Sequence, residues 1–340
     1  MVVNMHILGI ESSCDDTSVA LVEATENGFV VVSEKTSSQI EVHKKYGGVI
    51  PEIAGRMHAE NIIPVVEEVM KNQNKPDVVA VTSGPGLITG LLVGVETGKT
   101  LSNLWNIPLV SVNHIDGHIH SVELKAEKTT IEFPAICLVV SGGHTELLLM
   151  TNHNKFELLG KTRDDASGET FDKVAKLIGF EYPGGAKISK EAENGNPKAI
   201  DFPRPMIQTG YEFSFAGLKT SALYWLRDNP KFNKQDFCAS FETAIVDVLT
   251  TKTIRSIKEF NPKTVILAGG VSANKKLRET LGQTINKTNA KLLIPEMKYT
   301  MDNAAMIAVA GYYKTIKNNY TDWKTIEADP NWKVYTNNNE

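Results

Sequence analysis

Hydrophobic residues in this chain gather in short runs that alternate with small polar or glycine-rich turns. Residues 5–22 consist of two apolar runs separated by the polar stretch 11–17. Residues 135–150 repeat this pattern around the turn 141–145. Two apolar runs joined by a short polar turn are typical of a β-hairpin. We therefore predict two hairpins, each with a turn that can surround a phosphate or a metal ion.

A second pair of matching segments follows the hairpins. The apolar run 77–82 leads into Ser83-Gly-Pro-Gly86 and a helical pattern over 87 to about 104. The apolar run 264–268 leads into the glycine loop 269–274, which another helical pattern follows. A strand, glycine loop and helix in this order present backbone N–H groups to an anion. Matching units in matching order indicate a duplicated α/β fold, with a chance likeness of two α/β halves as the alternative.

The alternation of strands and helices predicts two α/β lobes with a cleft between them. We expect an N-terminal lobe over residues 1–134, on which 303–330 packs back, and a C-terminal lobe over 135–302. The proline- and glycine-containing stretch 182–213 is expected to be an ordered, loop-rich insert. Apolar side chains at helical spacing predict two helices of the C-terminal lobe, namely Phe171, Val174, Ala175 and Ile178, and Phe237, Phe241, Ile245 and Val248.

Composition favours a cytoplasmic location. The 340 residues include 41% hydrophobic ones, yet no apolar run approaches the length that crosses a membrane. The first residues lack the cationic and apolar regions of a signal peptide. The cysteines Cys14, Cys137 and Cys238 are widely spaced, which is typical of a reducing compartment and not of a disulfide framework.

The net charge of −4 argues against a dedicated nucleic-acid coat, because affinity for nucleic acid comes largely from Lys and Arg. Any RNA contact must therefore be a local patch or be shared with a partner. The basic clusters are small, and each is also explained by solvated surface charge: Lys44 and Lys45 with Arg56, Lys161 with Arg163, and Lys275 and Lys276 with Arg278.

His114 and His118 are four residues apart, so on a helix they lie on one face and can share a metal ion. Surface or core histidines are the alternative. Asp302 is the candidate third ligand, although it stands where a helix begins and is also explained as an N-cap. Two histidines and one carboxylate suit ferrous iron, with zinc as the second choice. The glutamate of a His-Glu-x-x-His protease is absent.

Three short glycine segments are candidates for nucleotide binding: Ser141-Gly-Gly143, the loop 269–274 and Pro183-Gly-Gly185. Asp172 either is a solvated carboxylate or faces the cleft and holds ribose hydroxyls. Gly94-Val-Glu-Thr-Gly98-Lys99-Thr100 superficially resembles a phosphate loop, but it has three residues between the glycines and lies within a helical pattern. We interpret Gly94 and Gly98 as sites of close helix packing.

Together these motifs resemble the family of bacterial-type tRNA N6-adenosine threonylcarbamoyltransferases, called TsaD. The resemblance runs from Ile7 to about Ile316, and the segment 46–51 is similar to the bacterial or mitochondrial branch. The motifs that carry it are Gly9-Ile-Glu-Ser-Ser-Cys-Asp-Asp-Thr17, Tyr46-Gly-Gly-Val-Ile-Pro-Glu52, Gly84-Pro-Gly86, His114 with His118, Val140-Ser-Gly-Gly-His-Thr145, Phe171-Asp-Lys173, Tyr182-Pro-Gly-Gly185, Phe202-Pro-Arg-Pro205, Phe213-Ser-Phe-Ala-Gly-Leu-Lys219 and Ala268-Gly-Gly-Val-Ser-Ala-Asn274.

The resemblance implies a duplicated actin and Hsp70-like ATPase (RNase H-like) fold. It implies that His114, His118 and Asp302 bind the metal. It also implies that the adenylate contacts Val139, Val140, Ser141, Gly142, Gly143, Asp172, Gly185 and Asn274. Asn113 stands where many relatives have a further histidine, and Met301 where a threonine is usual. Neither departure replaces a ligand.

The implied reaction passes a threonylcarbamoyl group from threonylcarbamoyl-AMP to N6 of adenosine 37 in tRNAs that read codons starting with A. AMP is a good leaving group, so direct metal-assisted transfer needs no covalent enzyme intermediate. The implied partners are tRNA, a smaller paralogous TsaB-like subunit and a TsaE-like P-loop ATPase. A kinase or ATPase of the same fold, a metalloprotease and a non-enzymatic scaffold are the competing hypotheses. A metalloprotease would need a glutamate beside the histidine pair, which is absent. A kinase or ATPase would not require the His114, His118 and Asp302 triad, and a kinase would want a catalytic aspartate at its sugar site. A scaffold would be expected to lose ligands, and here all are present.

Overall fold

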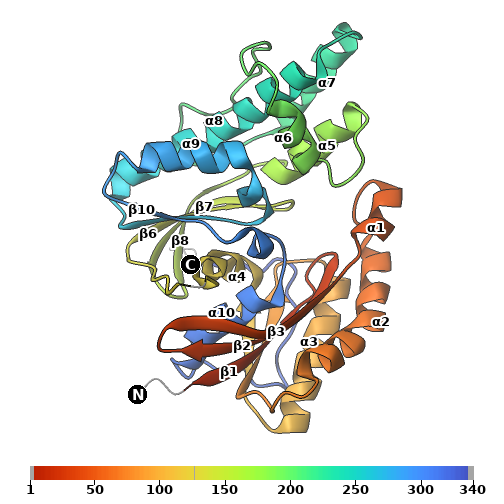
Figure 1. Cartoon of the computed structure of the whole chain (residues 1–340), viewed down its shortest axis with the longest axis vertical. Coiled ribbons are helices and arrows are strands. Elements are labelled where there is room, and N and C mark those ends of the chain that lie inside the picture. The colour runs from red at the N-terminus through yellow and green to blue at the C-terminus, as the bar shows by residue number, and fades with distance from the viewer. Residues whose placement is uncertain (1–3, 126, 336–340) are drawn as a thin grey trace. The chain divides into compact units, whose positions relative to one another are not determined.

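The computed structural model describes residues 4–125 and 127–335. The chain divides into two compact units, each of which is described by itself (Figure 1). The described part of the first unit comprises residues 4–125, 127–130 and 295–335, and the second unit comprises 131–294. The chain therefore leaves the first unit once and returns to it.

The first unit is built on a five-stranded mixed sheet in the order β3-β2-β1-β4-β5. Strand β2 runs antiparallel to its two neighbours β1 and β3, whereas β4 and β5 run parallel to β1. The strands span Met5–Glu11 (β1), Asp16–Thr25 (β2), Gly28–Ser38 (β3), Val78–Gly84 (β4) and Leu109–Asn113 (β5). Parallel neighbours place the carboxyl ends of β1, β4 and β5 at one edge of the sheet, and the segment that follows each of them starts there.

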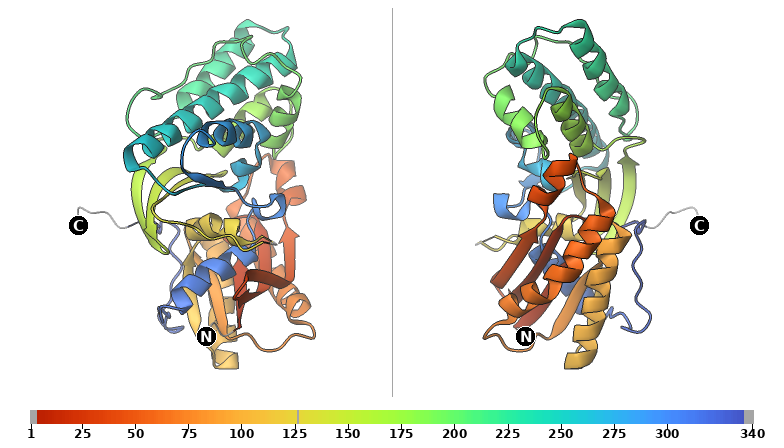
Figure 2. Two further views of the ribbon diagram at one scale, coloured as in Figure 1. Left: turned by 60° about the vertical axis from the view of Figure 1, so that its left-hand side comes forward. Right: turned by 90° about the vertical axis from the view of Figure 1, so that its right-hand side faces the viewer.

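Both faces of this sheet are covered by helices, because adjacent residues of each strand point to opposite faces. Ile7 packs with α10, Ala304–Thr315, while Leu8 packs in the core on the opposite face. That second core also holds α2, Pro51–Met70, and α3, Ile88–Trp105, which run side by side in Figure 2. Short helices α1 (Ile40–His43) and α4 (His114–His120) complete the unit.

The second unit contains a sheet in the order β10-β9-β6-β7-β8. Read from the other edge, its sequence of antiparallel and parallel pairs is the same as in the first unit, which supports duplication. The strands span Ala135–Val140 (β6), Thr145–Asn152 (β7), Lys155–Lys161 (β8), Thr264–Ala268 (β9) and Lys291–Leu293 (β10). Strands β6 and β9 have the bounds predicted from the apolar runs.

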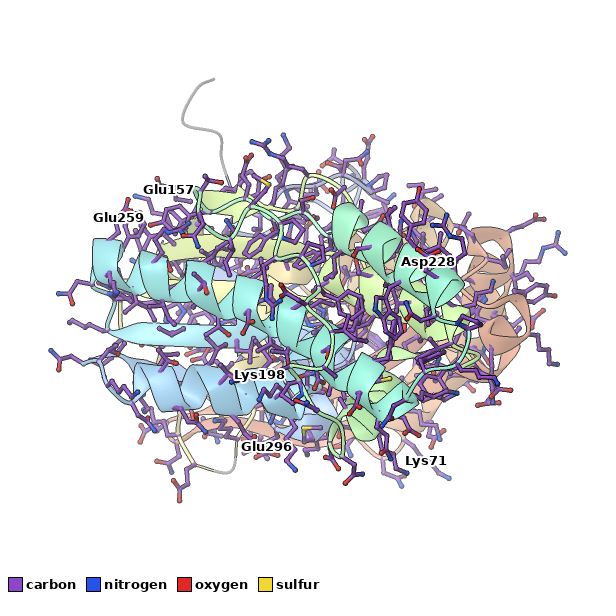
Figure 3. The ribbon with its side chains drawn as sticks, turned by 90° about the horizontal axis from the view of Figure 1, so that it is seen from above. Lys71, Glu157, Lys198, Asp228, Glu259 and Glu296 are labelled. Atoms are coloured by element: carbon purple, nitrogen blue, oxygen red, sulfur yellow. The ribbon has the colours of Figure 1, made fainter. Side chains whose placement is uncertain are left out.

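One face of this sheet carries a single large core that contains buried side chains of five helices. These are α5 (Ser167–Leu177), α6 (Gly185–Ala192), α7 (Ala216–Asp228), α8 (Lys234–Phe260) and α9 (Lys275–Ile285). Figure 3 shows α8 from above, with Glu259 near its C-terminal end and Asp228 at the end of α7. Phe202, Phe237 and Phe241 meet in this core with edge-to-face and stacked rings.

The description of 182–213 as loop-rich needs a correction, because the segment contains helix α6 over Gly185–Ala192. This helix begins at the second residue of a glycine pair and buries only Ile188 and Ala192, so the apolar signal was too short to predict it. The rest of the segment after α6, from 193 to 213, has no helix or strand.

The false phosphate loop lies within α3, as predicted. A Cβ on Gly94 would approach Ser12 Oγ to 2.3 Å, and one on Gly98 would approach Val81 to 3.2 Å. These glycines therefore allow α3 to pack closely against the sheet and against the turn that follows β1. Among the described residues, no helix combines the length and apolar character needed to span a bilayer.

Candidate metal centre and nucleotide loops

The histidine pair lies on α4, which begins directly after β5 at the carboxyl edge of the first sheet. Asn113 is the N-cap of this helix, and its side-chain oxygen accepts a hydrogen bond from Ile115 N at 3.0 Å. Every residue from His114 to His120 is buried. The rings of His114 and His118 meet edge to face, with centroids 4.6 Å apart. The helical spacing therefore brings both imidazoles to one place, as the sequence predicted.

Asp302 completes this group from the residues that precede α10. Its Oδ1 lies 3.5 Å from His114 Nε2 and 3.2 Å from His118 Nε2. The three ligand atoms are within 4.8 Å of one another. Asn303, and not Asp302, caps α10, because its side-chain oxygen accepts from Met306 N at 2.9 Å. The Asp302 side chain is thus not the cap of the helix that follows it.

The donor chemistry of this group fits a divalent metal. His118 is fully buried, and neither of its ring nitrogens makes a hydrogen bond within the described residues. Buried polar atoms are normally hydrogen-bonded, so a buried imidazole that faces a carboxylate without a hydrogen bond fits the role of a metal ligand. Imidazole nitrogens and a carboxylate oxygen are ligands that suit iron or zinc.

Glu11 holds His114 in the orientation that metal binding requires. Its Oε2 lies 2.9 Å from His114 Nδ1 and also accepts from Thr82 Oγ1 at 2.7 Å. Its Oε1 accepts from Ser13 N at 2.6 Å. A hydrogen bond from Nδ1 to this buried carboxylate leaves Nε2, which faces Asp302, as the nitrogen that can bind a metal once its proton is lost.

The ionisable groups of the centre shift the pKa values of their neighbours. Burial disfavours the imidazolium of His114, but the carboxylates of Glu11 and Asp302 outweigh this and raise its pKa to about 9. Burial alone would raise the pKa of Glu11, whereas His114 lowers it overall. Burial raises the pKa of Asp16 to about 7, and the nearby Asp302 adds to that effect. The carboxylates of Glu11, Asp16 and Asp302 concentrate negative charge here, which favours a bound cation.

Helices α4 and α10 are held tightly together around the ligands. A Cβ on Gly117 would lie 2.7 Å from Ile307 Cδ1, so a larger residue would have to displace that methyl group. On the other side of α4, His120 Nδ1 lies 2.7 Å from Glu123 Oε2, and Tyr313 donates to Glu123 Oε1 at 2.6 Å. The elements that carry the three ligands therefore form one rigid pair.

The first glycine loop of the second unit follows β6, whose last residues Val139 and Val140 are fully buried. Ser141 turns the chain, since its N–H donates to His144 O at 2.8 Å and its Oγ accepts from His144 N. A Cβ built on Gly142 or Gly143 would meet no atom within 4 Å. The backbone of these glycines is therefore accessible to a ligand.

Asp172 reaches the next glycine segment. Its Oδ1 accepts from Gly184 N at 2.7 Å and from Gly185 N at 3.1 Å, at the start of α6. The side chain is half-buried while its neighbours Phe171 and Val174 are in the core. Asp172 is therefore not merely a solvated surface carboxylate, because it fixes the loop that the sequence assigned to the same site.

Asn274 also forms a hydrogen bond with helix α6. It caps α9 through Leu277 N, and its Nδ2 donates to Ser189 Oγ at 2.8 Å and to Glu242 Oε1 at 2.7 Å. Burial raises the pKa of Glu242. Helix α6 thus connects Asp172 with Asn274, and the sequence had indicated neither α6 nor the roles of Ser189 and Glu242.

The remaining glycine loop, Ser83–Gly86 of the first unit, does not present its N–H groups to an anion. Gly86 N donates to Pro330 O at 3.3 Å and Leu87 N donates to Ser13 O at 2.7 Å. A Cβ on Gly84 would overlap Asp329 O. The expectation of an anion site here is wrong, because the chain's own backbone occupies the loop.

Comparison with solved structures confirms the fold class. HypF from T. kodakarensis superposes with a TM-score of 0.61 at 14% identity, over 95% of this chain and 49% of HypF, so the chain spans about half of that protein. The activator of 2-hydroxyisocaproyl-CoA dehydratase from Clostridium difficile has a TM-score of 0.52 at 14% identity, over 92% and 97% of the two chains. Both are actin and Hsp70-like ATPase folds.

Sequence comparison identifies the family. The chain is 46% identical over 337 residues to the tRNA N6-adenosine threonylcarbamoyltransferase of Thermosipho africanus, covering 97% of this chain and all of that protein. It is 49% identical over 319 residues to the protein of the same name from Listeria innocua, covering 91% of each. The family model described as TsaD, tRNA N6-adenosine threonylcarbamoyltransferase, matches residues 30–309. The chain therefore belongs to the TsaD family of tRNA N6-adenosine threonylcarbamoyltransferases and is a transferase.

Proposed function

We propose that this chain transfers a threonylcarbamoyl group from threonylcarbamoyl-AMP to N6 of adenosine 37 in tRNAs that read codons starting with A. The observation that carries this proposal is the group of His114, His118 and Asp302, with the His118 ring buried and without a hydrogen bond, in a chain of the TsaD family. A transferase that uses a good leaving group needs positioning and electrostatic stabilisation more than a nucleophile.

His114 Nε2, His118 and Asp302 would hold one divalent metal, ferrous iron in our proposal and zinc as the alternative. When bound there, the metal supplies a Lewis acid for the carbamoyl carbonyl. Glu11 keeps the proton on His114 Nδ1 and so keeps Nε2 available. The Gly117 contact with α10 keeps the spacing between His118 and Asp302 constant.

The adenylate would lie on the second unit, against Val139, Val140, Ser141, Gly142, Gly143, Asp172, Gly185 and Asn274. Gly142 and Gly143 leave room for their N–H groups to approach the phosphate. Asp172 and Gly185, already joined by a hydrogen bond, would bind the ribose side. Both amide hydrogens of Asn274 are used within the protein, so its ligand contact would be through the second lone pair of Oδ1.

The partners we propose are tRNA, a smaller paralogous TsaB-like subunit and a TsaE-like P-loop ATPase, all in the cytoplasm. Three apolar side chains of α2 and α3 support a protein partner on the first unit: Ile63, Ile88 and Leu92 are 52%, 42% and 46% exposed. Arg56, Arg163 and Lys275, one from each basic cluster, already form ion pairs with Glu52, Glu212 and Glu193. These three charges are thus partly neutralised within the protein before any tRNA phosphate is bound.

The competing functions are less well supported. The described residues around the metal group include no glutamate on α4 in the position of a His-Glu-x-x-His protease base. A kinase of this fold would not require a buried His118, without a hydrogen bond, beside Asp302.

The test is turnover of threonylcarbamoyl-AMP on unmodified tRNA at a stated salt concentration, with and without the two partner proteins. We expect modified adenosine only with the partners present. Multiple turnover by this chain alone would overturn the partner proposal, and no product under any condition would overturn the proposed reaction.

A further inference from the structure

The segment after α10 forms a strap, defined here as residues 320–335, which crosses the first unit without helix or strand of its own. Figure 2 shows it at the blue end of the colour scale. It begins on the edge strand β5, where Thr321 N donates to Leu109 O at 2.8 Å and Thr321 Oγ1 accepts from Ser111 N. Ile326 then enters the core beneath α2 and α3.

The strap next crosses the carboxyl ends of β4 and β5. Asp329 N donates to Ser83 O at 2.7 Å, and Pro330 O accepts from Gly86 N. Gly84 has a φ of 157° and no room for a Cβ beside Asp329 O. This edge of a sheet is where ligands usually bind in α/β proteins, and here the chain covers part of it itself.

The strap ends at the cap of the metal-site helix. Asn113 Nδ2 donates to Trp332 O at 3.1 Å, while Asn113 Oδ1 caps α4. The next residue along the chain is the ligand His114. The Trp332 ring lies under Lys314 Nζ at 5.0 Å from its centroid, and Lys314 Nζ donates to Ser111 O at 2.8 Å. Trp332 is thus tied both to α10 and to the start of α4.

We propose that the strap is a positioning element for the metal centre, acting through Trp332 and the Asn113 cap. This rests on the proposed metal function of His114, His118 and Asp302. Helix α4, which carries the histidines, and helix α10, which begins just after Asp302, are already joined by Gly117 and Tyr313. The strap adds a third connection, at the N-terminal end of α4, where the ligand His114 lies.

The expected loss of metal affinity follows from the contacts that each substitution removes. Residues that hold metal ligands from outside commonly change metal affinity 10- to 100-fold when replaced. Asn113→Ser keeps an oxygen for the cap but loses the donor to Trp332 O, and we expect about fivefold weaker binding. Trp332→Ala removes the ring beneath Lys314 and loosens the strap, for which we expect about 10-fold.

The two changes act on one connection, so their effects should not multiply. We expect the double variant to bind about 10- to 15-fold more weakly, and not the roughly 50-fold of independent sites. Lys333→Ala is the matched control, because Lys333 is exposed and lies next to Trp332 in the same segment.

The measurement is the dissociation constant of Co²⁺ for the full-length protein by chelator competition, together with its visible absorption spectrum and the melting temperature. The proposal predicts weaker binding and an altered spectrum for both single variants, and wild-type values for Lys333→Ala. A lower melting temperature with unchanged Co²⁺ affinity and spectrum would overturn it, since that is the result for a strap that only stabilises the fold. Wild-type protein that binds no Co²⁺ would instead overturn the metal centre itself.

Discussion

The role of Glu11 is open to a direct test with Glu11→Gln. The carboxylate is fully buried and accepts from three donors, Ser13 N, Thr82 Oγ1 and His114 Nδ1. A glutamine has one acceptor oxygen in place of two. If that oxygen takes the Oε1 position, the amide nitrogen faces His114 Nδ1, and His114 must shift its proton to Nε2 and lose its metal-binding lone pair. If the oxygen takes the Oε2 position instead, the amide nitrogen takes the Oε1 position, and the Ser13 N–H then faces another donor.

Either arrangement removes a charge-assisted hydrogen bond or leaves a buried donor unpaired. Each of these costs about 1–3 kcal/mol, which corresponds to roughly 5- to 150-fold in metal affinity. We therefore expect Glu11→Gln to weaken Co²⁺ or Zn²⁺ binding on the order of 10- to 100-fold. Thr82→Val is the matched control, since it removes one hydrogen-bond donor to the carboxylate but leaves the charge of Glu11 and its hydrogen bond with His114.

The measurement is the metal dissociation constant of each variant by chelator competition. Circular dichroism verifies that each variant is folded. Affinity within twofold of wild type for a folded Glu11→Gln protein would refute the assignment of Glu11 as the residue that sets the His114 tautomer.

Three further changes probe the rest of the molecule. Gly142→Val should abolish AMP binding in calorimetry with little change in melting temperature, because its Cβ meets no protein atom; unchanged AMP affinity would contradict the proposed loop. Burial raises the pKa of Glu146 to about 7, so the folded state keeps a proton that the unfolded state loses, and stability falls as pH rises from about 4.5 to 7. Glu146→Gln should therefore stabilise the protein by on the order of 1–3 kcal/mol at pH 8 and by little at pH 4 in urea denaturation, and an equal effect at both values would show the reasoning wrong. Lys252 is fully buried and donates to the carbonyls of Met206, Thr209 and Gly210, so Lys252→Met should cost about 3–5 kcal/mol, and a thermal shift under 2 °C would count against this role.

Much of the fold was predictable because its signals are local. Strands β6 and β9 coincide with their apolar runs, and the helices that carry Phe171 and Phe237 follow from spacing alone. The histidine pair on α4 was found for the same reason, since four residues along a helix bring two side chains to one face. The glycines of α3 were correctly separated from a phosphate loop because they lie inside a helical pattern.

What the sequence did not indicate depends on contacts between distant residues. Glu11 and His114 are 103 positions apart, and Asn274 and Ser189 are 85 apart. The Ser83–Gly86 loop has the composition of an anion site, but the distant residues Asp329 and Pro330 fill it. Composition indicates what a loop can bind, whereas only the tertiary structure shows what already occupies it.

The central claim is that threonylcarbamoyl transfer depends on the metal held by His114, His118 and Asp302. The most direct measurement is the amount of modified adenosine formed per minute on unmodified tRNA, with both partner proteins, as a function of metal bound per chain. The protein is purified without air, stripped of metal and reloaded stepwise with Fe²⁺ or Zn²⁺. The rate should rise in proportion to bound metal up to one equivalent, and His118→Ala should show neither bound metal nor product while keeping its fold. Full activity of the metal-free protein, or a full equivalent of metal in His118→Ala, would contradict the account.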